Sequence, residues 1–140
     1  MHVQKALPLT EEQFLDAALS GDEVKVALGL SQQPPIDIDT TDTDGETALH
    51  RAVVRKHSAV VLRLLASTAN VHASNSAGMM PLHCAAAGNA GEQIILALLA
   101  HKADITAPDN NDLTVLHHIV KNTGSFFGAY SKTEAIKWLR

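Results

Sequence analysis

The chain has 140 residues, of which 46% are apolar and 19% are charged, so it can bury a core and is not expected to be disordered. Its formal net charge of −4 argues against a nucleic-acid partner, and its apolar runs fall short of the roughly 18 residues that suggest a membrane span. The single cysteine, Cys84, excludes an intrachain disulfide and favours a cytoplasmic or nuclear setting.

The N-terminal segment predicts a short lead-in followed by a pair of helices. Residues 1–9 lack the apolar run of a secretory signal. Thr10 and Gln13 have the spacing of a capping box, which predicts a helix that begins after Thr10 and ends at Gly21. A second apolar run predicts a second helix, and Pro34-Pro35 then excludes helix because the residue before each proline favours extended backbone.

An acidic loop follows between Ile36 and Glu46. A calcium site is the alternative to consider, because Asp42-Thr43-Asp44-Gly45 resembles part of an EF-hand loop. With Gly45 as the sixth loop position, the first and twelfth positions would fall on Thr40 and Arg51, which are not adequate ligands. We therefore expect a solvated hairpin that uses the turn chemistry of Asp and Gly.

The rest of the chain repeats one design. Its anchors are the dipeptides Leu49-His50, Leu82-His83 and Leu116-His117, whose histidines lie 33 and 34 residues apart. Small or apolar residues follow each anchor, and a second apolar run follows the first two. A fixed period of this size predicts a stack of repeated supersecondary units.

These units resemble the ankyrin repeat, whose signature is Thr-Pro-Leu-His followed by small residues. The resemblance covers residues 12–140. It implies an all-α solenoid of stacked helix-turn-helix units joined by hairpin loops, with signature histidines that tie neighbouring hairpins together. The stretches that carry it are Thr47-Ala48-Leu49-His50, Pro81-Leu82-His83-Cys84-Ala85-Ala86 and Thr114-Val115-Leu116-His117.

The predicted organisation consists of a lead-in and four repeats, and we expect the chain to be a fragment of a longer protein. The first repeat is a degenerate cap with a Pro-rich and Asp-rich connector, and the last holds an aromatic insertion and is incomplete. The ranges are 1–9 for the lead-in, then 10–41, 42–74, 75–108 and 109–140 for the repeats.

Several turn positions depart from the family pattern. Lys56, Thr68 and Lys102 stand where glycine is usual, so we expect non-glycine residues in left-handed backbone there. Thr47 and Ser58 are the predicted caps of the two helices of the second repeat. Three further histidines, His57, His72 and His101, are expected to be exposed turn or hairpin residues.

No pattern in the sequence predicts catalysis, a cofactor or a metal. Side chains of adjacent helical residues diverge by about 100°, so His83 and Cys84 are not expected to form a catalytic pair. Equivalent histidines of stacked units would lie about 10 Å apart, too far to share a zinc ion.

The resemblance implies a non-catalytic, monomeric module that binds a protein or peptide on the concave face formed by the hairpin tips and first helices. The alternatives are a targeting or regulatory domain of a larger enzyme, channel or secreted bacterial effector, and a structural spacer. Met79 and Leu113 are expected to be exposed apolar contacts, and whether the aromatic insertion binds or packs is open. The candidate residues are Asp44, Glu46, Val54, Arg55, Ser76, Met79, Asn110, Asn111, Leu113, Lys121, Phe126, Phe127 and Tyr130.

Overall fold

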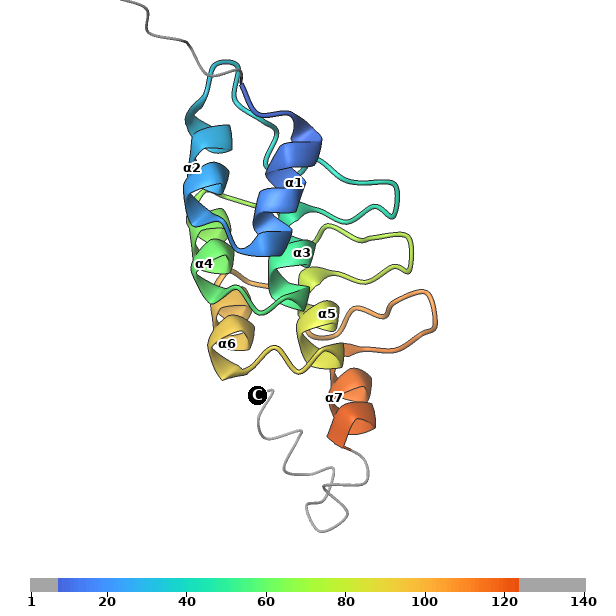
Figure 1. Cartoon of the computed structure of the whole chain (residues 1–140). Helices are drawn as coiled ribbons and strands as arrows, with labels where there is room; N and C mark the ends of the chain where they lie inside the picture. The colour runs from blue at the N-terminus through green and yellow to red at the C-terminus, as the bar shows by residue number, and fades with distance from the viewer. Residues whose placement is uncertain (1–7, 124–140) are drawn as a thin grey trace, which may run out of the picture.

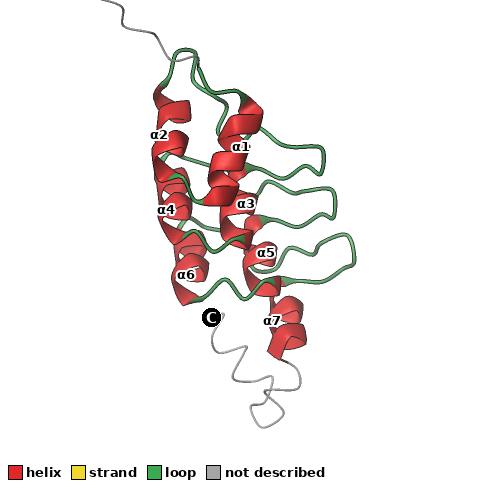
Figure 2. Ribbon diagram, in the orientation of Figure 1, coloured by secondary structure: helices red, strands yellow, loops and turns green. Residues whose placement is uncertain are grey.

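The computed structural model describes residues 8–123. In this range the helices form two columns, and the helices of one column run antiparallel to those of the other (Figure 1). Figure 2 shows helices joined by loops, and within this range the only strand-like pairing is an isolated bridge between Thr41 and Thr47. The helices are α1 (Glu11–Ser20), α2 (Glu23–Ser31), α3 (Ala48–Val54), α4 (Ser58–Ala66), α5 (Pro81–Ala87), α6 (Glu92–Ala100) and α7 (Val115–Thr123).

The odd-numbered helices form an inner column and the even-numbered helices an outer column. Within each column every helix contacts the equivalent helix of the next unit, from α1 through α3 and α5 to α7, and from α2 through α4 to α6. Three hairpin loops project from the inner column in the same direction (Figure 1). The predicted all-α stack of helix-turn-helix units is confirmed.

The first helix begins and ends as the sequence predicts. Thr10 Oγ1 accepts a hydrogen bond from the Gln13 N–H at 3.1 Å, and Gln13 Oε1 accepts one from the Thr10 N–H at 3.0 Å. The helix ends at Gly21, which adopts left-handed backbone with φ of 80°. A side chain on Gly21 would also collide with the imidazole of His57, at 2.7 Å.

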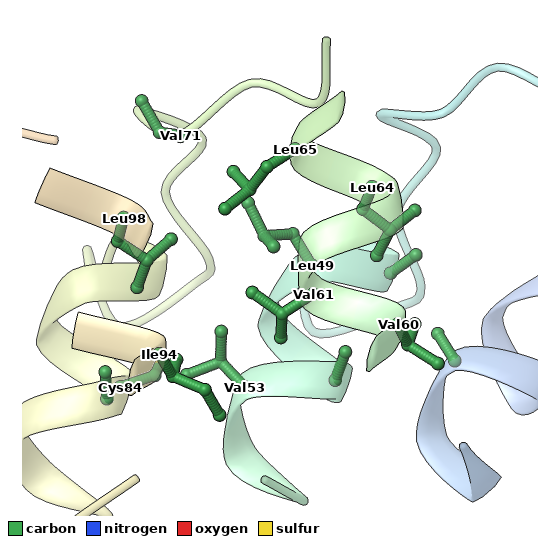
Figure 3. Close-up of a cluster of buried hydrophobic side chains, with 14 of the residues drawn as sticks. Leu49, Val53, Val60, Val61, Leu64, Leu65, Val71, Cys84, Ile94 and Leu98 are labelled. Atoms are coloured by element: carbon green, nitrogen blue, oxygen red, sulfur yellow. The ribbon is translucent and has the colours of Figure 1, made fainter. Parts of the chain in front are cut away.

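The core lies between the columns (Figure 3). Alanines of the inner column, such as Ala52 and Ala85, are fully buried and let the helices approach closely. Larger side chains, such as Leu49, Leu64 and Leu98, fill the space between the columns and are at most 1% exposed. Truncating one such leucine to alanine costs about 2–5 kcal/mol of unfolding free energy.

Two of the signature histidines, His50 and His83, tie their units to the next hairpin, as the resemblance implies. His50 Nδ1 accepts a hydrogen bond from the backbone N–H of Thr47 at 3.1 Å, so its Nε2 carries the hydrogen and donates to the Met79 carbonyl at 2.8 Å. His83 Nε2 donates in the same way to the Ala107 carbonyl at 2.7 Å. Each imidazole therefore serves its own helix start and the following hairpin at once.

Five residues other than glycine adopt left-handed backbone in the described part of the chain, including the three that the sequence predicts. Lys56 and Asn89 lie between the two helices of their units, and Thr68 and Lys102 follow the second helices. The fifth is Asp112, which occupies the hairpin position that Gly45 and Gly78 hold in the two preceding units. Each costs free energy that glycine would not.

Two expectations about the second repeat are wrong. Ser58 is the first residue of α4 and not its cap, because the N-cap residue is His57, which makes no side-chain capping bond. His57 is half-buried, not a simple exposed turn residue, because its Nε2 donates to the Leu19 carbonyl of the preceding unit at 2.9 Å. His72 and His101 are exposed, as expected.

Replacing Lys102 with glycine should stabilise the protein, because Lys102 has φ of 67°. We expect a gain of about 0.5–1 kcal/mol, a rise in Tm of about 2–4 °C, since the relief of strain exceeds the added entropy of the unfolded chain. Thermal unfolding followed by circular dichroism would measure it. In the matched control, Ala59→Gly inside α4 should lose about 1 kcal/mol. A lower Tm for Lys102→Gly would refute the strain at this turn.

Stability should fall as the pH is lowered from 7.5 to 5. Burial holds the pKa of His50 below the ordinary 6.5, although the Met79 carbonyl raises it. The unfolded chain therefore takes up a proton near pH 6.5 while the native chain does not, which costs at most about 1.4 kcal/mol per pH unit. The lowered pKa values of Asp42, Asp104 and Asp109 act in a separate window, near and below pH 4.

Urea unfolding at several pH values would measure this slope. The comparison is His50→Gln, which should be less stable throughout but should lose less additional stability on acidification. Equal slopes for the two proteins would show that His50 is not the group responsible.

Candidate functional site

The three hairpins that project from the inner column share one internal geometry. In each, an Asp or Asn side chain accepts hydrogen bonds from the backbone N–H groups two and four residues further on, at 2.8–3.0 Å. The same residue pairs its own backbone N–H with the carbonyl four residues on. The turn residues are Asp42, Asn75 and Asp109, and the hairpins they hold are 42–46, 75–79 and 109–113.

Consecutive hairpins are also bonded to each other. The Ser76 N–H donates to the Asp44 carbonyl at 2.9 Å. One unit further on, the Asn110 N–H donates to the Ala77 carbonyl at 3.0 Å, and Asn110 Nδ2 donates to the Ser76 carbonyl at 2.9 Å. The row of hairpins is therefore a fixed surface and not a set of independent loops.

Glycine at position 78 makes this close contact possible. Gly78 has φ of 74°, and a Cβ there would lie 2.7 Å from the Asn110 backbone nitrogen and closer still to its side chain. Backbone groups never come this close to a real Cβ, so Gly78→Ala would force the two hairpins apart.

Two of the three turn residues pair with the helix residue nine positions later, which is Arg51 in one unit and His118 in the other. Asp42 pairs with Arg51 at 2.8 Å, and Arg51 also reaches Asp16 of α1 at 3.2 Å. Asp109 pairs with His118 at 2.8 Å, and both are buried. We call these two pairs, Asp42–Arg51 and Asp109–His118, the clamps. They were not predicted from the sequence, although an acidic and a basic residue nine positions apart recur in two units and could have indicated them.

The clamps keep the turn carboxylates ionised. Burial works against ionisation of Asp42, but the Arg51 side chain and the N–H groups of Glu46 and Asp44 hold its pKa below the ordinary value. For Asp109, burial is again opposed, by the Leu113 N–H and then by His118, and the pKa is lowered. Both carboxylates are thus committed to the hairpin.

Most of the remaining predicted side chains of the hairpins and helix ends are exposed. Asp44 and Asn111, each two residues after a turn residue, are exposed, and so is Ala77 at the equivalent place between them. On the inner column, Val54 is 46% exposed, and Arg55 and Lys121 are exposed. Ser76 is exposed and Glu46 is half-buried.

Three of the predicted contact residues have structural roles or lower exposure than expected. Met79 is half-buried against the core, since the bond from His50 to its carbonyl holds this position close to the helices. Leu113 is half-buried too, and its backbone closes the last hairpin against Asp109. Asn110 is exposed, but its amide is used between hairpins. The predicted contacts Phe126, Phe127 and Tyr130 lie outside the described residues.

The groups considered for catalysis or metal binding are engaged in the fold. His83 uses Nε2 for the Ala107 carbonyl, and burial raises the pKa of the Cys84 thiol to about 12. The Asp42 carboxylate is occupied by two N–H groups and Arg51. Among residues 8–123, no three His, Cys, Asp or Glu side chains gather as a metal site would require. No helix in that range is long and apolar enough to cross a membrane.

Comparison with known proteins agrees with the repeat geometry. RelA-associated inhibitor of Mus musculus is 38% identical over 99 residues, which are 71% of this chain and 12% of that protein. Putative ankyrin repeat protein FPV031 of Fowlpox virus is 43% identical over 70 residues, 50% of this chain and 20% of that protein. Tyrosine-protein kinase Shark of Drosophila melanogaster is 30% identical over 110 residues, 78% of this chain and 12% of that protein.

The chain thus corresponds to a small part of each of these relatives. Residues 14–109 match three copies of the family described as ankyrin repeats. This range begins in α1, ends at the Asp109 turn and contains both histidine ties. The chain belongs to the ankyrin repeat family.

Proposed function

We propose that this domain binds a protein or peptide partner through the hairpin tips and the exposed ends of the inner-column helices. Ankyrin repeats are in general protein–protein interaction modules and typically not catalytic, and the mouse relative is named for its association with RelA. The partner itself and the binding face are our proposal for this chain.

One observation carries the proposal. Each hairpin satisfies its backbone with its own turn residue and bonds to its neighbour, while the side chain two positions after the turn residue stays exposed. Asp44, Ala77 and Asn111 thus form a row on a rigid frame. A surface that is already ordered loses little conformational entropy on binding, which favours affinity.

The inner-column helix ends extend this surface. Val54 is an exposed apolar side chain at the end of α3, and Arg55 and Lys121 add positive charge. A mixed surface with one apolar position and charges of both signs suits a polar protein surface or a peptide. A cytoplasmic or nuclear setting is part of the proposal, supported by the single, buried cysteine.

A second candidate function is a targeting or regulatory module within a larger protein. The relatives favour this function, because the matched segment makes up only 12% of the mouse inhibitor and 12% of the fly kinase. Sequencing the full reading frame that contains this chain would test it. Binding through the hairpin face is compatible with both candidates.

An affinity capture from lysate with a matched pair of variants tests the binding face. The variant Val54→Asp with Asn111→Arg changes the hairpin face and should lose at least tenfold of the captured partner, because each exchange buries a new charge without a partner in the interface. The control, Thr68→Asp with Gln33→Arg, introduces the same two charges at exposed positions that follow α4 and α2 of the outer column, outside the hairpin face, and should capture as the wild type does.

Both variants alter exposed positions, so circular dichroism should give unchanged helix content. Full capture by the hairpin variant would contradict the proposed face. Loss of capture by the control alone would place the partner on the outer column.

A further inference from the structure

Three leucines at equivalent positions of the outer column are exposed to solvent. They are Leu28, Leu62 and Leu96, spaced 34 residues apart, and they are 54%, 43% and 51% exposed. The outward face of an amphipathic helix normally carries polar residues. Single exposed apolar residues are ordinary, but the same exposed position occupied by leucine in three successive units forms a continuous stripe.

The surroundings of this stripe are also apolar. Val24, one turn before Leu28, is 70% exposed, and Ala59 and Ala66 are exposed on either side of Leu62. An open hollow of about 440 Å³ is lined by Ala59, Leu62 and Ala66 together with Glu23, Arg63 and Ser67. Glu23 and Arg63 pair across the two helices at 2.8 Å, so they neutralise each other.

Two other charges lie beside the stripe at opposite ends of the stack. Lys25 precedes Leu28 by three residues on α2, and Glu92 precedes Leu96 by four on α6. Residues three or four apart share a helix face, so both charges flank the stripe. Both are exposed, and neither side chain has a partner within residues 8–123.

We propose that this outer face, comprising Val24, Lys25, Leu28, Leu62, Glu92 and Leu96, binds the outer face of a second copy of the chain. The two-fold axis of this dimer lies in the interface and runs parallel to the axis of α4. The order of the units is therefore reversed between the two copies. Leu62 then meets Leu62 of the second copy, Leu28 meets Leu96, and Lys25 faces Glu92. A self-complementary patch of this kind is what a two-fold dimer requires.

Charge complementarity selects this arrangement. Rotation about the long axis of the stack would instead place each helix antiparallel to its own copy. Lys25 would then face the C-terminal end of α2 and would be separated from Glu92 by the other units. Only the axis along α4 brings the two unpaired charges together twice.

The size of the face indicates a weak dimer. Each outer helix has nine residues, so three helices packed about 10 Å apart make a face of roughly 13 by 30 Å, or about 400 Å² per copy. This is at the low end for protein interfaces, and we expect a dissociation constant on the order of 10–100 μM. The dimer departs from the monomer expected from the sequence, and it leaves the hairpin face uncovered.

Sedimentation equilibrium from about 10 to 500 μM tests the proposal. The wild type should shift from monomer to dimer over this range, and Leu62→Asp, with unchanged helix content, should remain monomeric. Lys25→Glu alone and Glu92→Lys alone should each weaken the dimer several-fold, while the double exchange should restore it. Val54→Asp on the inner column is the control and should dimerise as the wild type does.

Cysteine crosslinking identifies the pairing. An oxidised mixture of Leu28→Cys and Leu96→Cys proteins should give the mixed disulfide, and Leu28→Cys alone should not. The native Cys84 is buried and should not react, so oxidised wild type gives the background. A wild type that stays monomeric at 500 μM, a double charge exchange without rescue, or self-crosslinking of Leu28→Cys would each overturn the proposal.

Discussion

The stack depends on a neutral imidazole that bonds in two directions at once. His50 and His83 are fully buried, each with Nδ1 turned to the start of its own helix and Nε2 to a carbonyl of the next hairpin. A protonated ring could not accept the first bond, and a lost ring would leave a carbonyl and an N–H unpaired in the interior. The distance between successive units is thus set by hydrogen bonds as well as by packed leucines.

Much of the fold was predictable because its determinants are local or periodic. The capping box at Thr10 and Gln13 needs only a spacing of three, and the histidine period reveals the stack. The left-handed turns at Lys56, Thr68 and Lys102 were predictable from the family's glycine positions. These features depend on the sequence within one unit, so reading one unit after another is sufficient.

What was not predictable depends on contacts between units. His57 was expected to be an exposed turn or hairpin residue, but it is half-buried and its Nε2 donates to the Leu19 carbonyl of the preceding unit. Met79 was expected to be exposed, but the bond from His50 to its carbonyl draws this position against the core. The clamp between Asp109 and His118 was partly predictable. Its spacing of nine residues recurs in the pair Asp42–Arg51, but the basic residue differs between the two units.

The two faces of the molecule have different constraints, and this decides what each can do. On the hairpin side, backbone bonds and glycine contacts fix the frame, so only the exposed side chains on that frame can be exchanged without disturbing it. On the outer side, nothing in the fold requires leucine at positions 28, 62 and 96, because these side chains are about half exposed.

A dimer through the outer columns would direct two hairpin faces away from each other. A partner with two suitable sites could then bind both, and the second binding event would benefit from a raised effective concentration. Weak self-association at one face could in this way strengthen recognition at the other without any change in the hairpins themselves.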